Sequence, residues 1–141
     1  MQGARYPCEM GRILISRVNT PQVTLVSVID DDESVRSSLV LLLRSQGFDS
    51  RGYASGEAFL EATDAMESRC LVVDVGLKGM SGIELQARLR SLKSTVPIIF
   101  ISAHRDDETI RRAHAGGGRD FLVKPFSEAT LLASIDRLLN P

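Results

Sequence analysis

The sequence predicts an α/β fold in which a five-stranded parallel sheet is covered by helices on both faces. Two observations support this prediction. Short apolar runs, which are typical of strands buried on both faces, recur four times between residues 23 and 123, and a short segment at 48–53 is a further candidate strand. Each run is followed by a segment whose apolar residues recur at helical spacing. Strands and helices therefore alternate along the chain, and five such units are expected to form one doubly wound (βα)5 domain.

These four runs and the segment at 48–53 are expected to be the five strands. The first is rich in β-branched residues and stops at an acidic cluster that begins with Asp30. The third is apolar until its last residue, Asp74, and the fifth is followed by Lys124. The expected strands cover residues 23–29, 48–53, 69–74, 96–101 and 120–123.

The helices are expected where capping residues precede an amphipathic pattern. Asp32 and Glu33 suit the start of the first helix, because carboxylates there accept from free backbone N–H groups and complement the helix dipole. Ser81 and Glu84 have the spacing of a capping box at the start of the third. Three glycines at 116–118 end the fourth. The expected helices cover about 33–46, 56–64, 82–92, 107–115 and 128–139.

The first twenty residues are expected to be a loosely ordered extension, and the domain is expected to cover 21–141. The segment has no clear period before Pro21. Its apolar stretch at 13–15 is too short for the core of a signal peptide. A short strand or turn is expected around 12–18.

The composition excludes several classes of protein. Seventeen basic and eighteen acidic residues give a net charge of −1, so a basic surface for direct nucleic-acid binding is not expected. No apolar run approaches the roughly 18 residues of a membrane-spanning helix. The two cysteines, Cys8 and Cys70, are too few for a disulfide framework or a zinc site. We therefore expect a reduced, cytoplasmic protein without membrane contact.

Polar side chains interrupt the pattern at the carboxyl ends of four expected strands. Asp30 and Asp31 follow the first, Asp74 ends the third, Ser102 follows the fourth and Lys124 follows the fifth. In a parallel sheet these ends share one edge, where ligands bind. Contact with solvent explains any one polar residue at a strand end, but it explains the whole set less well.

These residue types favour chemistry on a phosphoryl group. Three carboxylates close together repel one another unless a cation intervenes, and oxygen ligands without histidine or thiolate suit Mg²⁺. Ser102 can donate to a phosphoryl oxygen, and Lys124 supplies a mobile positive charge. A carboxylate can also be a nucleophile that forms an aspartyl phosphate. Asp74 is the natural candidate, because it stands alone at the end of the middle strand.

Five motifs in this order carry a family resemblance that runs over about residues 24–139. They are VIDDD at 28–32, LVVD at 71–74, GMSG at 79–82, ISA at 101–103 and DFLVKPF at 120–126. The chain thereby resembles the receiver domain of two-component response regulators, and most of all the nitrogen-fixation and nitrate-regulator type. Regulators of that type carry a helix-turn-helix output domain after the receiver. We expect either a single-domain regulator or the receiver of a longer protein.

The resemblance implies a flavodoxin-like strand order, 2-1-3-4-5, and a phosphoacceptor site. Asp74 would take a phosphoryl group from the histidine of a sensor histidine kinase. Asp31, Asp74 and the backbone carbonyl of Gly76 would bind Mg²⁺ directly, and Asp30 would help to hold it. Such a domain is not an enzyme, and slow self-dephosphorylation is the most that is expected of it.

The resemblance also implies a conformational switch. Ser102 and Lys124 would contact the phosphoryl oxygens, and Ser102 with Phe121 would change the face formed by residues 106–139. Phe121 stands where the family often has Tyr, so any signal that needs the hydroxyl is lost. The Lys124–Pro125 peptide bond would be a cis turn. The 106–139 face is expected either to pair with a second copy in a homodimer or to be a solvated charged surface.

Three positions depart from the family pattern, and two other functions stay open. Gly76, Lys78 and His104 bear on the lifetime of the phosphoryl group and the shape of the loop after the third strand. The spacing Asp30-x-Asp32 loosely resembles the nucleophile motif of haloacid-dehalogenase-like phosphatases, whose activity turnover of a phosphate ester would reveal. A degenerate receiver that only binds proteins is the other alternative, and it would not be modified by a small phosphodonor.

Overall fold

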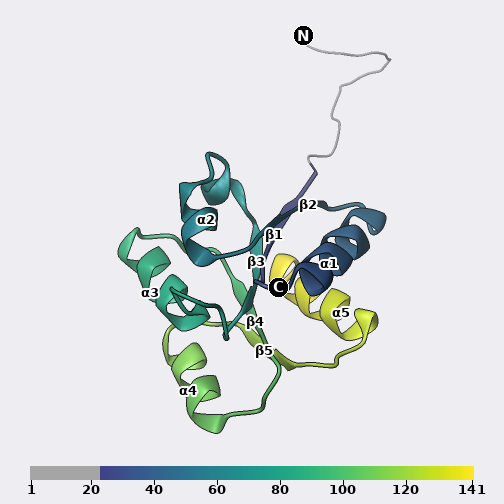
Figure 1. Ribbon diagram of the computed structural model, residues 1–141. Coiled ribbons are helices and arrows are strands. Elements are labelled where there is room, and N and C mark those ends of the chain that lie inside the picture. Colours follow the sequence, from purple (N-terminus) through teal and green to yellow (C-terminus); the bar gives the residue numbers. More distant parts are fainter. Residues whose placement is uncertain (1–22) are drawn as a thin grey trace, which may run out of the picture.

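The structure is a computed structural model that describes residues 23–141, so the extension predicted over 1–20 lies outside the described residues. Five parallel strands form one sheet in the order β2-β1-β3-β4-β5 (Figure 1). The predicted fold class and the strand order implied by the resemblance are both confirmed. Within residues 23–141, no helix combines the length and the apolar character needed to cross a lipid bilayer.

The strands agree with the predicted runs to within two residues at each end. β1, β3 and β4 are buried along their whole length, which explains why their sequences are continuously apolar. β4 begins later than predicted, because Pro97 has no N–H group to contribute to the ladder. The strands are β1 (Leu25–Ile29), β2 (Asp49–Tyr53), β3 (Cys70–Asp74), β4 (Ile98–Ser102) and β5 (Asp120–Val123).

The predicted caps are present at the helix starts. The Asp32 carboxylate accepts from the N–H groups of the first turn of its helix, and Ser81 with Glu84 forms a complete capping box. The second helix is shorter than predicted, because Ala62 is extended and Asp64 is held by Tyr53 and Arg51 of β2. A separate 3₁₀ turn, η2 (Ala65–Glu67), follows it. The helices are α1 (Glu33–Ser45), α2 (Gly56–Glu61), α3 (Gly82–Ser91), α4 (Asp107–Ala115) and α5 (Glu128–Leu139).

Two apolar clusters cover opposite faces of the sheet. Alternate strand residues such as Val72 and Val73 belong to different clusters, because successive side chains point to opposite faces. One cluster packs against α1 and α5, and the other packs against α2, α3 and α4 (Figure 1). Cys70 lies in the first cluster as a small core residue, and burial raises the pKa of its thiol to about 12.

The α4 helix has the weakest hold on the core. Ala113 is the buried residue of this helix, whereas α5 buries Leu131, Ser134 and Ile135. The fourth helix is therefore sparsely packed against the sheet. Because few apolar contacts hold it, this helix is a natural element to move in a conformational change.

Candidate functional site

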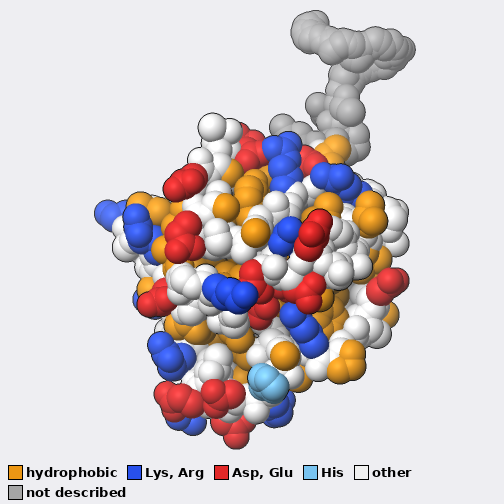
Figure 2. All heavy atoms as spheres, viewed as in Figure 1, with side chains coloured by type: hydrophobic (Ala, Val, Ile, Leu, Met, Phe, Trp, Pro, Cys, Tyr) orange, Lys and Arg blue, Asp and Glu red, His pale blue; other side chains and the backbone are white. Residues whose placement is uncertain are grey.

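The carboxyl ends of β1, β3 and β5 bring four of the predicted site residues together. Carboxylate oxygens of Asp30, Asp31 and Asp74 all lie within 4.8 Å of one another. The Lys124 ammonium lies 3.2 Å from Asp30 Oδ2 and 3.5 Å from Asp74 Oδ2. Acidic and basic side chains are interspersed over the face drawn in Figure 2. The site is thus a compact acidic cluster with one cation inserted between two of its carboxylates.

Asp30 is a fully buried carboxylate at the end of β1. Its Oδ1 atom accepts from the Asp32 N–H at 2.9 Å, and its own N–H donates to the Tyr53 carbonyl at 3.1 Å. Burial raises the pKa of Asp30 and the Asp74 carboxylate raises it further, while the Asp32 N–H and Lys124 oppose the rise. A carboxylate in this position gains from any additional cation that binds beside it.

Asp74 is the last residue of β3, and its carboxylate is held at both oxygens. Oδ1 accepts from the Gly76 N–H at 3.0 Å, while Oδ2 faces Lys124. The side chain retains 12% exposure, which leaves access from solvent. Asp31 is exposed, and its Oδ2 accepts from the Lys78 N–H at 3.3 Å.

Lys124 connects the site to the end of β4. Burial alone would lower the pKa of Lys124, but the carboxylates of Asp74 and Asp30 outweigh burial, so the pKa is raised. The ammonium is therefore a firmly charged group. The Lys124 N–H donates to the Ser102 carbonyl at 2.7 Å, and the Lys124–Pro125 bond is cis, as the resemblance implied.

Ser102 lies at the predicted edge, but its hydroxyl bonds to its own chain. The hydroxyl donates to the His104 carbonyl at 2.8 Å and accepts from the His104 N–H at 3.1 Å. Phe121, on β5, is half-buried, with its ring 6.5 Å from the ring of Phe100. In this structure Ser102 and Phe121 are placed near the site without taking part in the cluster of charged groups.

One further residue, Arg36, contacts the site and was not among the predicted site residues. Its guanidinium donates to the Asp30 carbonyl at 2.8 Å. Its spacing from Asp32 could have revealed it in the sequence. Arg36 lies one turn after Asp32, the cap of α1, and this spacing sets a helix side chain beside the end of β1.

A close approach of α3 to the end of β3 fixes the loop that carries Gly76. A Cβ atom on Gly82 would lie 2.7 Å from the Asp74 carbonyl oxygen and 2.9 Å from the Val75 Cα atom. Both neighbours are backbone atoms, so they cannot move aside as a flexible side chain can. Gly82 therefore lets the first turn of α3 pack directly against the end of β3.

We expect Gly82→Ala to lower the free energy of unfolding by about 1–3 kcal/mol, the usual cost of overpacking. Urea unfolding followed by circular dichroism measures this effect. Gly76→Ala is the matched control, because a Cβ atom there meets Asp74 Oδ1 at an ordinary 3.6 Å. Equal stability of the two variants would contradict the close-packing argument.

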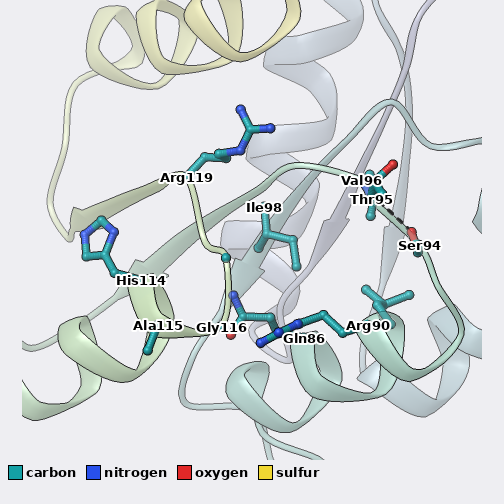
Figure 3. A pocket seen from close by; sticks show the side chains of 12 residues that line it. Gln86, Arg90, Ser94, Thr95, Val96, Ile98, His114, Ala115, Gly116 and Arg119 are labelled. Atoms are coloured by element: carbon teal, nitrogen blue, oxygen red, sulfur yellow. Dashed lines mark hydrogen bonds between the residues drawn. The ribbon is translucent and has the colours of Figure 1, made fainter.

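A separate cavity lies between α3 and α4, lined by Gln86, Arg90, His114 and Gly116 among others, and by none of the site carboxylates (Figure 3). Arg90 and His114 stand in the last turns of their helices, where basic side chains complement the helix dipole. The Gln86 amide donates to the Ala113 carbonyl at 3.0 Å and ties α4 to α3. The polar residues that line the cavity therefore have roles in the stability of α3 and α4.

Comparisons with known proteins agree with this geometry. The family model described as the response regulator receiver domain matches residues 26–136. Response regulator protein TodT of Pseudomonas putida is 35% identical over 136 residues, which cover 96% of this chain and 58% of TodT. Transcriptional regulatory protein FixJ of Azorhizobium caulinodans is 37% identical over 115 residues, covering 82% of this chain and 54% of FixJ. The structure of chemotaxis protein CheY4 of Vibrio cholerae matches with a TM-score of 0.77 at 27% identity, covering 84% of this chain and 100% of CheY4.

The match to the family model extends from β1 into α5, so it contains every residue of the acidic cluster and Lys124. The chain spans less than two thirds of the length of TodT and of FixJ. The resemblance seen in the sequence, including its relation to regulators of the nitrogen-fixation type, is confirmed by these relatives. The chain belongs to the response regulator receiver domain family.

Proposed function

We propose that this receiver domain accepts a phosphoryl group on Asp74 from the phosphohistidine of a sensor histidine kinase. One observation carries the proposal. The Asp74 carboxylate, whose side chain is 12% exposed, belongs to a cluster that also contains Asp30, Asp31 and the Lys124 ammonium. A nucleophile, a cation-binding set and a fixed positive charge are the parts that phosphoryl transfer to a carboxylate needs.

The transfer step uses groups whose positions are given above. An Asp74 oxygen attacks the phosphorus atom, and the new P–O bond forms as the P–N bond to the donor imidazole breaks. The imidazole keeps the electron pair of that bond and takes up a proton. Asp74 is oriented by the Gly76 N–H, and Lys124 can exchange its contact with Asp74 for a charge-assisted bond to a phosphoryl oxygen.

The cluster fits Mg²⁺ as a cofactor. Its ligand atoms are all oxygens, three carboxylates converge within 4.8 Å, and the buried Asp30 has a raised pKa that a nearby cation would relieve. Asp31, Asp74 and the Gly76 carbonyl would hold the ion directly, with Asp30 behind them. When bound, Mg²⁺ neutralises the charge that builds up between the carboxylates and the phosphoryl oxygens.

We further propose that phosphorylation is reported through Ser102 and Phe121. The Ser102 hydroxyl would leave His104 and donate to a phosphoryl oxygen, which draws the loop after β4 inward. To change the ratio of active to inactive conformation from 1:99 to 99:1, phosphorylation must favour the active conformation by roughly 5.5 kcal/mol. Charge-assisted hydrogen bonds from Ser102 and Lys124 supply about 1.5–3 kcal/mol each, so a partial shift is expected from them alone.

We expect Ser102→Ala to keep phosphorylation of Asp74 but to lose most of this conformational response. Hydrogen exchange over residues 104–126, with and without a beryllofluoride phosphate mimic, measures the response. Ser91→Ala is the control, because its hydroxyl donates to a helix carbonyl on α3. A full response in Ser102→Ala, or an unchanged exchange of this region in the wild type, would show that Ser102 does not transmit the signal.

The 106–139 face is proposed as the surface that responds, and a homodimer through it is part of the proposal. Asp120 lies on this face, but its carboxylate is bonded within its own chain, where it accepts from Ser134 Oγ at 2.6 Å and from Arg137 at 2.8 Å. Arg112 and Arg119, which form no ion pair with any residue in 23–141, are the better candidates for contacts between copies.

The remaining expectations belong to the same proposal. The domain would cover 21–141 with an extension over 1–20, act in the cytoplasm as a phosphoacceptor rather than an enzyme, and make no direct contact with nucleic acid or membrane. The family match does not favour a haloacid-dehalogenase-like phosphatase. The complete set of Asp30, Asp31, Asp74, Ser102 and Lys124 does not favour a degenerate binding module.

Incubation with acetyl phosphate and Mg²⁺, followed by intact-mass spectrometry, tests the proposal. We expect the mass of one phosphoryl group to be added, and hydroxylamine to remove it as it does from acyl phosphates. A chain that gains no mass would have lost the acceptor function, and the binding module would then be the better description.

A further inference from the structure

We propose that Arg36 is a positioning residue for the divalent-cation site, and that Gly52 is needed for the Arg36 side chain to reach it. The inference rests on the proposed function, because it concerns the site through which Asp31 would bind Mg²⁺. Arg36 touches neither the cation nor the phosphoryl group in this scheme. It acts on the peptide that joins Asp30 to Asp31.

The first observation is the hydrogen bond from the Arg36 guanidinium to the Asp30 carbonyl, at 2.8 Å. That oxygen belongs to the peptide group linking Asp30 to Asp31. The N–H of Asp30 is held by Tyr53 and its carboxylate is held by Asp32 and Lys124. Arg36 therefore fixes the part of Asp30 that sets the direction in which the chain presents Asp31.

The second observation is the path of the Arg36 side chain across β2. A Cβ atom on Gly52 would lie 2.8 Å from Arg36 Cγ, 3.1 Å from Arg36 Cδ and 3.3 Å from Val40 Cγ2. The methylene stem of Arg36 thus occupies the space that a side chain at position 52 would need. Glycine inside a strand weakens the strand, and a close approach of another group is a usual reason for it.

The third observation concerns charge. Within residues 23–141 Arg36 forms no ion pair, and its guanidinium is bonded to a neutral main-chain oxygen. A positive charge beside a cation site repels the cation, so loss of the charge alone would strengthen Mg²⁺ binding. Loss of positioning would weaken binding. The two possible roles of Arg36 therefore predict effects of opposite sign.

The test measures Mg²⁺ binding to the unphosphorylated protein by isothermal titration calorimetry, with no phosphodonor present. Arg36→Met retains most of the stem and removes the donor, and we expect its dissociation constant for Mg²⁺ to rise about tenfold, the lower end of the effect seen for groups that orient metal ligands. Gly52→Ala keeps the charge but displaces the stem, and it should also weaken binding. Arg36→Lys, which restores one donor, should recover part of the affinity.

Arg44→Met is the matched control. Arg44 lies on the same helix and also donates to a main-chain oxygen of β2, the Ser50 carbonyl, at 2.7 and 3.1 Å. It lies at the other end of α1, away from the acidic cluster, so Mg²⁺ affinity should stay at the wild-type value. Circular dichroism in EDTA shows whether each variant is folded. If Arg36→Met does not fold, the Mg²⁺ affinity of Gly52→Ala decides whether Arg36 positions the cation site.

Tighter or unchanged Mg²⁺ binding in Arg36→Met, or wild-type binding in Gly52→Ala, would overturn the inference. Labelling by acetyl phosphate separates this failure from failure of the proposed function. If the wild type binds Mg²⁺ and is labelled while the variants match it, the positioning role of Arg36 alone is wrong. If the wild type neither binds Mg²⁺ nor gains a phosphoryl group, the proposed function fails, and this inference fails with it.

Discussion

Asp74→Asn is expected to reduce phosphorylation by acetyl phosphate and Mg²⁺ to the background level. The amide has nearly the shape of the carboxylate, and its oxygen can still accept the hydrogen bond that the Gly76 N–H now donates at 3.0 Å. An amide oxygen is, however, a far weaker nucleophile than a carboxylate oxygen. The substitution also removes one charge from a cluster of three carboxylates, so the fold should not lose stability.

Asp49→Asn is a suitable control for this variant. Asp49 is the first residue of β2, at the opposite end of the strands from the site, and its carboxylate is paired with Arg51 at 3.5 Å. Intact-mass spectrometry should show full labelling of Asp49→Asn and none of Asp74→Asn. Labelled Asp74→Asn, with the modification mapped by peptide mass to Asp30, would place the nucleophile on β1 instead.

Much of the site could be predicted because it follows from the fold. β1, β3 and β4 are buried on both faces, so a polar residue at the end of such a strand stands out against an apolar run. Parallel strands then bring those ends to one edge. Asp74 was visible in the sequence for this reason. Its carboxylate lies 3.5 Å from the ammonium of Lys124, which follows β5, so the edge argument places both residues correctly.

The rest of the site depends on contacts that leave no periodic pattern in the sequence. The hydroxyl of Ser102 is turned toward His104 by local loop geometry, so a list of strand ends does not reveal its partners. Arg36 reaches the site from a helix, over a strand position that is open because residue 52 is glycine. The Arg36 contact depends on α1, β1 and β2 at once, and it becomes visible when those elements are placed in space.

Asp31→Ala is expected to remove most of the Mg²⁺-dependent phosphorylation while leaving the fold intact. An approaching phosphoryl group meets the carboxylates of Asp30, Asp31 and Asp74 at close range, and transfer is slow unless a cation offsets their charge. Asp31 is the exposed member of the three, and the contact that it makes, with the Lys78 N–H at 3.3 Å, lies at the surface. Its loss should therefore change the free energy of unfolding by no more than about 0.5 kcal/mol.

The neighbouring residue provides a control with the opposite pattern of effects. Asp32 is also exposed and acidic, but its carboxylate caps α1 by accepting from the Ser34 N–H at 2.9 Å and the Val35 N–H at 3.3 Å. Asp32→Ala should cost about 1 kcal/mol of stability, as loss of an N-cap usually does, and keep the Mg²⁺ dependence of labelling. Labelling rates measured against Mg²⁺ concentration, together with urea unfolding in EDTA, distinguish the two roles. Equal rates in EDTA and in Mg²⁺, or an Asp31→Ala chain labelled as fast as the wild type, would mean that the cluster acts through its own charges and Lys124 without a divalent cation.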